Sequence, residues 1–265
     1  MPQEPLLIDK KDNVVTLILN RPAKRNSLSL ELVGVLLKTL EDLAADSAVR
    51  AIVIRGSGDK AFCAGFDIHS LPTNSAEDVE DRLKALEQVE ALFKTVVNFP
   101  YPVVAMINGT AFGAGCELAL CCDIRIGADS ARMGMPPAKL GIVYPWTGLQ
   151  RFIQTIGLQS TREMFFTGHK YDGKQLRELG LLDHLVASED AASFTYQMAE
   201  EIAANAPLAL KGTKRVINLL MQSGTLDESR RTEANALTKA AFLSEDMKEG
   251  RLAFIEKRKP EFTGK

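Results

Sequence analysis

The stretch from Pro102 to Asp123, PVVAMINGTAFGAGCELALCCD, contains residues that can carry acid–base chemistry. Gly113, Ala114 and Gly115 open a predicted helix, and the free N–H groups at a helix start favour negative charge. Glu117 follows three residues after Ala114, so the two share one helical face about one turn apart. A carboxylate beside N–H groups that can hold an oxyanion is the minimum equipment for enolate chemistry. Taken alone, the stretch fits a plain strand–helix junction with an exposed glutamate better.

Alternating strands and helices must position these residues. The apolar run before Asn108 predicts a buried strand that ends where the candidate helix is about to begin. Ser29 can cap a helix that runs to about Ala45, with one apolar face of Leu32, Leu36, Leu40 and Leu43. Three further elements are expected: a hairpin of Leu6–Ile8 with Val14–Leu19, a short buried strand at Ala51–Ile54, and a helix that opens at a capping box, Ser75 to Asp78, and ends before Pro100.

The composition places the chain among ordinary soluble enzymes. It has 265 residues, 46% hydrophobic and 25% charged, with a net charge of −2, so no basic excess points to nucleic acid. The N-terminus lacks a signal-peptide pattern, and no apolar stretch is long enough to span a bilayer. The four cysteines show no zinc spacing, so we expect no metal and reduced thiols in the cytoplasm.

A second glycine-containing junction lies at residues 62–68, FCAGFDI, and offers a backbone N–H at Phe66 that can meet the one at Ala114. AFCAGFDI, followed about fifty residues later by INGTAFGAGCELALCCDIRI, resembles the paired signatures of the crotonase (enoyl-CoA hydratase/isomerase) superfamily. The resemblance extends nearly end to end, from RPAKRNSL at residues 21–28 to AFIEKRKPEF at residues 253–262. Several separated motifs in the right order are far more specific than one glycine motif.

The resemblance implies an α/β fold, a crotonase-like spiral of ββα units with a C-terminal helical trimerisation region. It divides the chain into a core of residues 1–190 with the catalytic and CoA-binding site and a helical oligomerisation region of residues 191–265, and it implies a homotrimer or a hexamer built as a dimer of trimers. Helical patterns after Val186 agree with this division, at Glu189–Asn205, Leu208–Met221, Asp227–Leu243 and Asp246–Lys257.

The resemblance also implies an acyl-CoA substrate, with coenzyme A entering as part of the substrate and no separate cofactor. By position, Lys24 and Arg25 match the family's basic loop, and the Ala64 carbonyl matches its adenine contact, with Ile68 close by in the same segment. Phe254 and Lys257 match a contact made by the C-terminal helix, often from a neighbouring subunit. Cations suit the phosphates of coenzyme A, although exposed Lys and Arg are usually only solvated.

The reaction that the resemblance implies is of the enoyl-CoA hydratase or isomerase type, a lyase chemistry in which Glu117 would be the acid/base and the N–H groups of Phe66 and Ala114 would form the oxyanion hole. Hydratases of the family use a second glutamate. Its place is held here by Pro137, which has no acid or base to offer, so ordinary two-carboxylate hydration is in doubt.

The segments AGFDIHSLP, MPPAKLGIVY and SEDMKEGRLAFIEKRKPEF resemble methylmalonyl-CoA decarboxylase more than the hydratases. In that relative a tyrosine faces the substrate at the position of Tyr144. Loss of CO₂ from a malonyl-type thioester gives an enolate that the same N–H groups can hold. Phe66 stands where that enzyme has histidine, and an ionised Glu117 would repel a substrate carboxylate, which counts against decarboxylation. Further alternatives are a hydrolase on the same scaffold, which lacks an added carboxylate nucleophile, and a non-catalytic CoA-binding protein.

Overall fold

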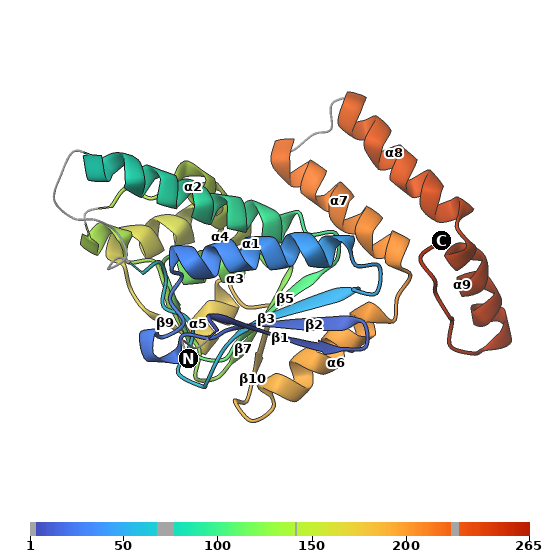
Figure 1. The fold of residues 1–265 in the computed structure, drawn as a ribbon, viewed down its shortest axis with the longest axis horizontal. Coiled ribbons are helices and arrows are strands. Elements are labelled where there is room, and N and C mark those ends of the chain that lie inside the picture. The colour runs from blue at the N-terminus through green and yellow to red at the C-terminus, as the bar shows by residue number, and fades with distance from the viewer. Residues whose placement is uncertain (1–3, 68–76, 141, 224–227) are drawn as a thin grey trace.

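The computed structural model describes residues 4–67, 77–140, 142–223 and 228–265. Among these, the helices and strands follow one another from an N-terminal hairpin to a C-terminal group of helices (Figure 1). In chain order they are β1 (Leu6–Lys11), β2 (Val14–Leu19), η1 (Pro22–Lys24), α1 (Leu30–Ala45), β3 (Ala51–Gly56), β4 (Ala61–Cys63), α2 (Glu77–Val97), β5 (Val103–Ile107), β6 (Thr110–Phe112), α3 (Ala114–Leu120), β7 (Ile124–Ala128), β8 (Arg132–Gly134), η3 (Pro137–Leu140), α4 (Trp146–Thr167), β9 (Tyr171–Asp172), α5 (Gly173–Glu178), β10 (His184–Val186), α6 (Ala191–Ala203), α7 (Pro207–Ser223), α8 (Glu228–Leu243) and α9 (Glu245–Glu256).

The strands form two sheets, and from β3 to β8 successive strands alternate between them. The larger sheet has the order β1-β2-β3-β5-β7-β10 and is parallel except for the β1–β2 hairpin. The smaller has the order β4-β6-β8-β9, and its β4–β6 and β6–β8 pairs are parallel. In each of three successive units, the first strand (β3, β5, β7) joins the larger sheet, the second (β4, β6, β8) joins the smaller, and a helix follows. The expected spiral of ββα units is confirmed.

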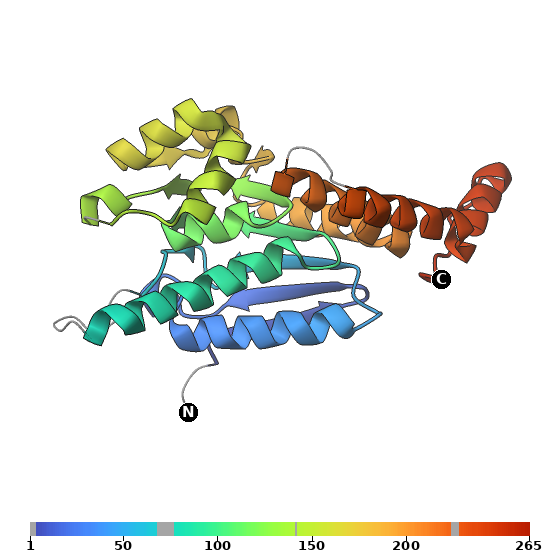
Figure 2. The same ribbon diagram turned by 90° about the horizontal axis from the view of Figure 1, so that it is seen from above.

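Helices cover both faces of the larger sheet, which explains why its inner strands β2, β3 and β5 are buried on both sides. Every residue of β5 is buried. On one face, α1 and α2 lie side by side (Figures 1 and 2), and α1 buries the expected leucine stripe. Ser29 caps α1 by accepting a hydrogen bond from the Leu32 N–H at 3.3 Å. On the other face, α6 packs its Ala199 and Ala203 against a second apolar cluster.

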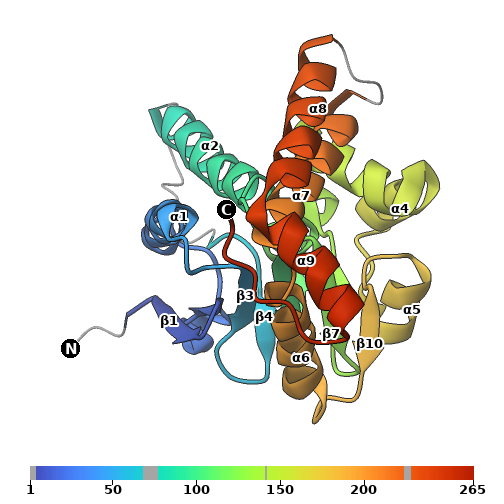
Figure 3. The same cartoon turned by 90° about the vertical axis from the view of Figure 1, so that its right-hand side faces the viewer.

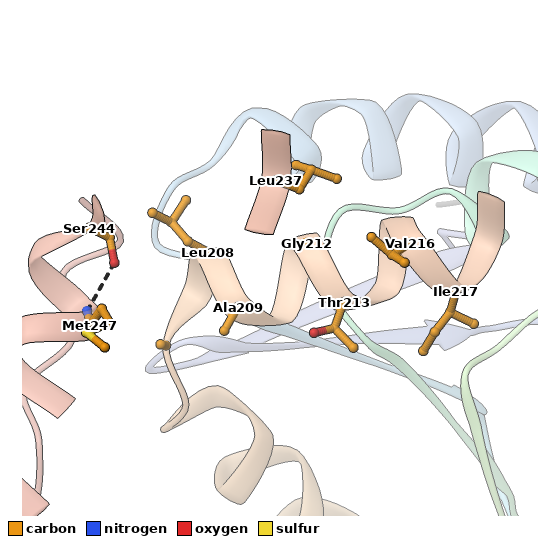
Figure 4. Close-up of a pocket in the computed structure, with 10 residues that line it drawn as sticks. Leu208, Ala209, Gly212, Thr213, Val216, Ile217, Leu237, Ser244 and Met247 are labelled. Carbon is orange, nitrogen blue, oxygen red and sulfur yellow. Dashed lines mark hydrogen bonds between the residues drawn. The ribbon is translucent and has the colours of Figure 1, made fainter. Parts of the chain in front are cut away.

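The C-terminal helices extend away from the sheets as an arm of α7, α8 and α9 (Figures 1 and 3). The four helices expected after Val186 are confirmed as α6 to α9. An apolar pocket lies along α7 within this arm (Figure 4). It is lined by Leu208 and Val216 of α7, Leu237 of α8 and Met247 of α9. No helix in the described part of the chain is long and apolar enough to cross a membrane.

Candidate active site

Two neighbouring strand ends bring the candidate backbone donors together. β4 and β6 are parallel neighbours, so the chain leaves both at the same edge of the smaller sheet. Leu28 N–H donates to Gly65 O at 2.8 Å, and Asp67 N–H donates to Leu28 O at 2.9 Å, which turns the intervening Phe66 N–H away from Leu28. Within the described ranges, no hydrogen-bond acceptor is found for the N–H of Phe66 or of Ala114.

Gly65 explains why the two junctions can approach closely. Its φ is +107°, a conformation that L side chains rarely adopt, and a Cβ built on it would stand 2.7 Å from Phe112 O and 3.6 Å from the Ala114 nitrogen. Any side chain at residue 65 would therefore collide with the strand end before α3. The glycine therefore lets the strand end before α3 approach the segment that carries Phe66.

Glu117 lies one turn into α3, and its carboxylate is buried rather than exposed. The residue is 2% exposed. Its Oε1 accepts from Arg151 Nη1 at 2.5 Å and its Oε2 accepts from the Tyr144 hydroxyl at 2.5 Å. Burial raises the pKa of Glu117, while the Tyr144 hydrogen bond and the Arg151 charge oppose the rise. Burial and the adjacent Glu117 raise the pKa of the Tyr144 phenol well above its ordinary value, so Tyr144 stays a donor.

Arg151 and Glu90 complete the group and were missed from the sequence. Arg151 Nη2 donates to Glu90 Oε1 at 2.7 Å, and the Thr147 hydroxyl donates to Glu90 Oε2 at 3.1 Å. A signal was available, because Tyr144, Thr147 and Arg151 are spaced by three and four residues, as on one face of a helix. Glu90, on α2, carries no such signal.

The basic loop joins the same edge through the backbone. Arg25 O accepts from Ala64 N–H at 3.0 Å, so the segment of Lys24 and Arg25 is tied to the junction that carries Phe66. Both basic side chains are exposed. Pro137, at the place of a second carboxylate, is buried at the start of η3.

The remaining predicted contacts are not brought together with this group. Lys257 is exposed just beyond α9, which lies in the arm, away from α3 and α4 (Figures 1 and 2). Ile68 lies outside the described residues, and Phe254 belongs to α9 although its side chain is not among those described. The described residues contain no cluster of His, Cys, Asp or Glu able to hold a metal ion. All four cysteines are free and buried.

Comparisons with known proteins identify the family of the chain. The family model for enoyl-CoA hydratase/isomerase matches residues 9–265. The chain belongs to this family. A crystal structure of a family member, enoyl-CoA hydratase from Bacillus anthracis, is similar with a TM-score of 0.92 and 32% identity over 99% of this chain and 100% of that one. The fold class expected from the sequence is therefore confirmed as the crotonase fold.

Two curated relatives carry the two reactions that the sequence left open. Crotonyl-CoA hydratase of Syntrophomonas wolfei is 33% identical over 265 residues, the whole of both chains. Methylmalonyl-CoA decarboxylase of Escherichia coli is 31% identical over 254 residues, 96% of this chain and 95% of that protein. These identities are too close to one another to choose a reaction for this member of the family.

Proposed function

We propose that the protein acts on an acyl-CoA thioester as an enoyl-CoA hydratase or isomerase. The thioester oxygen binds between the N–H groups of Phe66 and Ala114, and Glu117 is the acid/base that moves the proton or activates the water. One observation carries this proposal: a buried carboxylate stands one turn from an N–H pair that has no acceptor within the described ranges. Two strong donors leave each Glu117 oxygen one further lone pair for a substrate proton or a water molecule.

The charges around Glu117 favour the alkene over a malonyl-type substrate. Glu117 and Glu90 are two carboxylates that share the single guanidinium of Arg151. A substrate carboxylate placed beside them would be a third negative charge in a mostly buried site. Tyr144, which would have to orient that carboxylate, already donates its proton to Glu117.

Decarboxylation of a methylmalonyl-type CoA is the alternative. It is supported by Pro137, which stands where a second catalytic carboxylate belongs, and by Tyr144, which lies at the site and can orient a departing carboxylate if Glu117 is protonated. A non-catalytic CoA-binding protein is the further alternative.

For the CoA part of the substrate, we assign the phosphates to Lys24 and Arg25 and the adenine to the Ala64 carbonyl, with Ile68 in the same segment. Support comes from the backbone hydrogen bond that holds this basic loop against Ala64. Phe254 and Lys257 lie in the arm, so they reach this position only from another copy of the chain.

We therefore also propose that residues 191–265 assemble the protein into a homotrimer or a dimer of trimers, through the apolar arm. Light scattering on the purified protein tests this proposal. A monomer at micromolar concentration would contradict both the assembly and the contacts assigned to Phe254 and Lys257.

The deciding experiment is incubation with crotonyl-CoA and, separately, with methylmalonyl-CoA, with products read by mass. A gain of one water supports hydration, and loss of CO₂ supports the alternative. Glu117→Gln is expected to lower turnover of crotonyl-CoA by at least about 10²-fold, the usual range for loss of a general acid/base. Glu87→Gln, a change on the exposed surface of α2, is the matched control. Unchanged turnover in Glu117→Gln would remove Glu117 from the mechanism.

A further inference from the structure

Arg151 is held in a way that leaves one donor for Glu117. Its Nη1 and Nη2 face the two oxygens of Glu90, at 3.2 Å and 2.7 Å, which is the paired geometry of a guanidinium and a carboxylate. Nη1 carries two hydrogens, and it also donates to Glu117 Oε1 at 2.5 Å. The guanidinium therefore bridges two carboxylates from different helices, α2 and α3.

The bridge is enclosed. The side chains of Arg151 and Glu90 are 17% and 21% exposed, and that of Glu117 is 3% exposed. The guanidinium lies over the Phe93 ring, with 5.8 Å from its carbon to the ring centroid. A cation with these neighbours cannot turn freely toward Glu117, because Glu90 fixes its plane.

We propose that Glu90 and Arg151 are positioning residues that set both the orientation and the protonation of Glu117. Arg151 stabilises the Glu117 carboxylate. Glu90 limits that stabilisation because it accepts from both terminal nitrogens of Arg151 and partly neutralises its charge. Glu117 is thereby an anion that can still accept a proton during turnover. This inference rests on the proposed role of Glu117 as the acid/base.

The other charged or titratable groups near the bridge do not replace it. Tyr144 donates to the opposite oxygen of Glu117 and stays protonated. Cys116 of α3 and Cys121, which caps the C-terminus of α3, are buried thiols whose pKa values burial raises, so they stay neutral. Lys94 approaches Glu90 only at 3.9 Å and its side chain is 63% exposed. Arg151 is thus the nearby charge that opposes the rise in the pKa of Glu117 caused by burial.

Two substitutions have opposite expected effects on the pH profile. Arg151→Gln removes the cation, so the acidic limb of kcat/KM moves to higher pH, by roughly one unit or more. Glu90→Gln removes the competing carboxylate and leaves the full cation to Glu117, so the limb moves to lower pH, by roughly half a unit. Arg151→Lys keeps the charge and loses the paired geometry, so kcat falls while the limb stays near that of the wild type.

The titration of Glu117 is also followed without substrate, by infrared difference spectroscopy of wild type against Glu117→Gln. The band of the protonated carboxylic acid is recorded against pH in the wild type, in Glu90→Gln, in Arg151→Gln, in Arg151→Lys and in the surface control Glu87→Gln. This measurement needs no turnover, so it still tests the bridge if the protein turns over no thioester. Absence of turnover would contradict only the proposed function. Opposite shifts in Glu90→Gln and Arg151→Gln support the bridge. A uniform loss of rate with unmoved pH limbs and an unmoved band would overturn it, and an unmoved Glu90→Gln alone would remove Glu90 from it.

Discussion

Gly148 lies against Glu117 so closely that a Cβ built on the glycine would stand 2.8 Å from Glu117 Oε1. The same Cβ would be 2.5 Å from Cε1 of the Tyr144 ring. Gly148 is buried in the first turn of α4, halfway between Tyr144 and Arg151, the two residues that hold the carboxylate. The chain from residue 144 to residue 151 therefore wraps around Glu117, and it can do so only because its middle residue has no side chain.

Gly148→Ala is expected to displace Tyr144 or Glu117, because the added methyl has no room. Turnover of the substrate should fall by about 10-fold or more, since small misplacements at a reacting centre are costly. The free energy of unfolding should fall by about 1–3 kcal/mol, the usual cost of overpacking. Steady-state kinetics and urea melts measure both effects.

Gly34→Ala is the matched control for this change. Gly34 is exposed in α1, and nothing lies within 4 Å of a Cβ built on it. The control should keep its turnover and gain roughly 0.5–1 kcal/mol, because alanine is the better helix former. Equal turnover in Gly148→Ala and the wild type would mean that the carboxylate need not be held where the structure has it.

Gly65→Ala tests the N–H pair, which no side-chain deletion can remove. The added methyl meets Phe112 O at 2.7 Å and pushes the Phe66 N–H away from Ala114. We expect turnover to fall by about 10²-fold or more, the usual effect of losing one oxyanion donor, for every thioester that the protein accepts.

The control is Gly58→Ala, at a positive φ of 73° but with nothing within 4 Å of the new methyl. It carries backbone strain of about 1 kcal/mol without touching the site. If Gly58→Ala and Gly65→Ala lose the same turnover, strain rather than the N–H pair explains the effect.

A feature of the molecule could be predicted when its signal in the sequence was local. The cap at Ser29 and the leucine face of α1 were correct because capping and periodicity act within a few residues. The pairing of the Phe66 and Ala114 N–H groups in an oxyanion hole stays a prediction, and it came from two glycine-containing junctions that each have a local signal. The Glu90–Arg151–Glu117 bridge was not predicted, because its members lie 61 and 34 residues apart and charged residues on helices are usually solvated.

Asn26 offers a test of the loop that carries the basic residues. It is fully buried with a φ of 55°, and its Nδ2 donates to Ala61 O at 2.7 Å and to Ser57 O at 3.0 Å. Asn26→Ala removes both of these hydrogen bonds from a buried position and should cost about 1–3 kcal/mol in unfolding free energy. Arg25, which immediately precedes Asn26, is assigned to the CoA phosphates. KM for the CoA thioester should therefore rise more than kcat falls.

Asn13→Ala is the control for Asn26→Ala, since Asn13 Nδ2 also donates to a backbone carbonyl, that of Ala48 at 2.7 Å, but in an exposed turn. It should change neither KM nor kcat. A change in kcat alone for Asn26→Ala would show that the loop does not position the CoA part of the substrate.

The pH dependence of stability follows from the burial of Glu117. Burial raises its folded-state pKa above the ordinary value of 4.5, so between these two values the folded chain binds a proton that the unfolded chain has lost. Stability from this group is therefore fully present below pH 4.5 and is lost as the pH rises through the folded-state pKa.

Glu117→Gln removes the ionised form and keeps an oxygen that can accept from Arg151 or Tyr144. We expect the variant to be more stable than the wild type at pH 8 by about 1 kcal/mol, as found when a functional buried charge is replaced. The difference should shrink to near zero below pH 4.5, where the wild-type carboxyl is also neutral. Urea melts of both proteins across this range measure it, because the difference between them cancels the other titrating groups. A wild type that is the more stable of the two at pH 8 would mean that the hydrogen bonds from Tyr144 and Arg151 outweigh the cost of burying the charge.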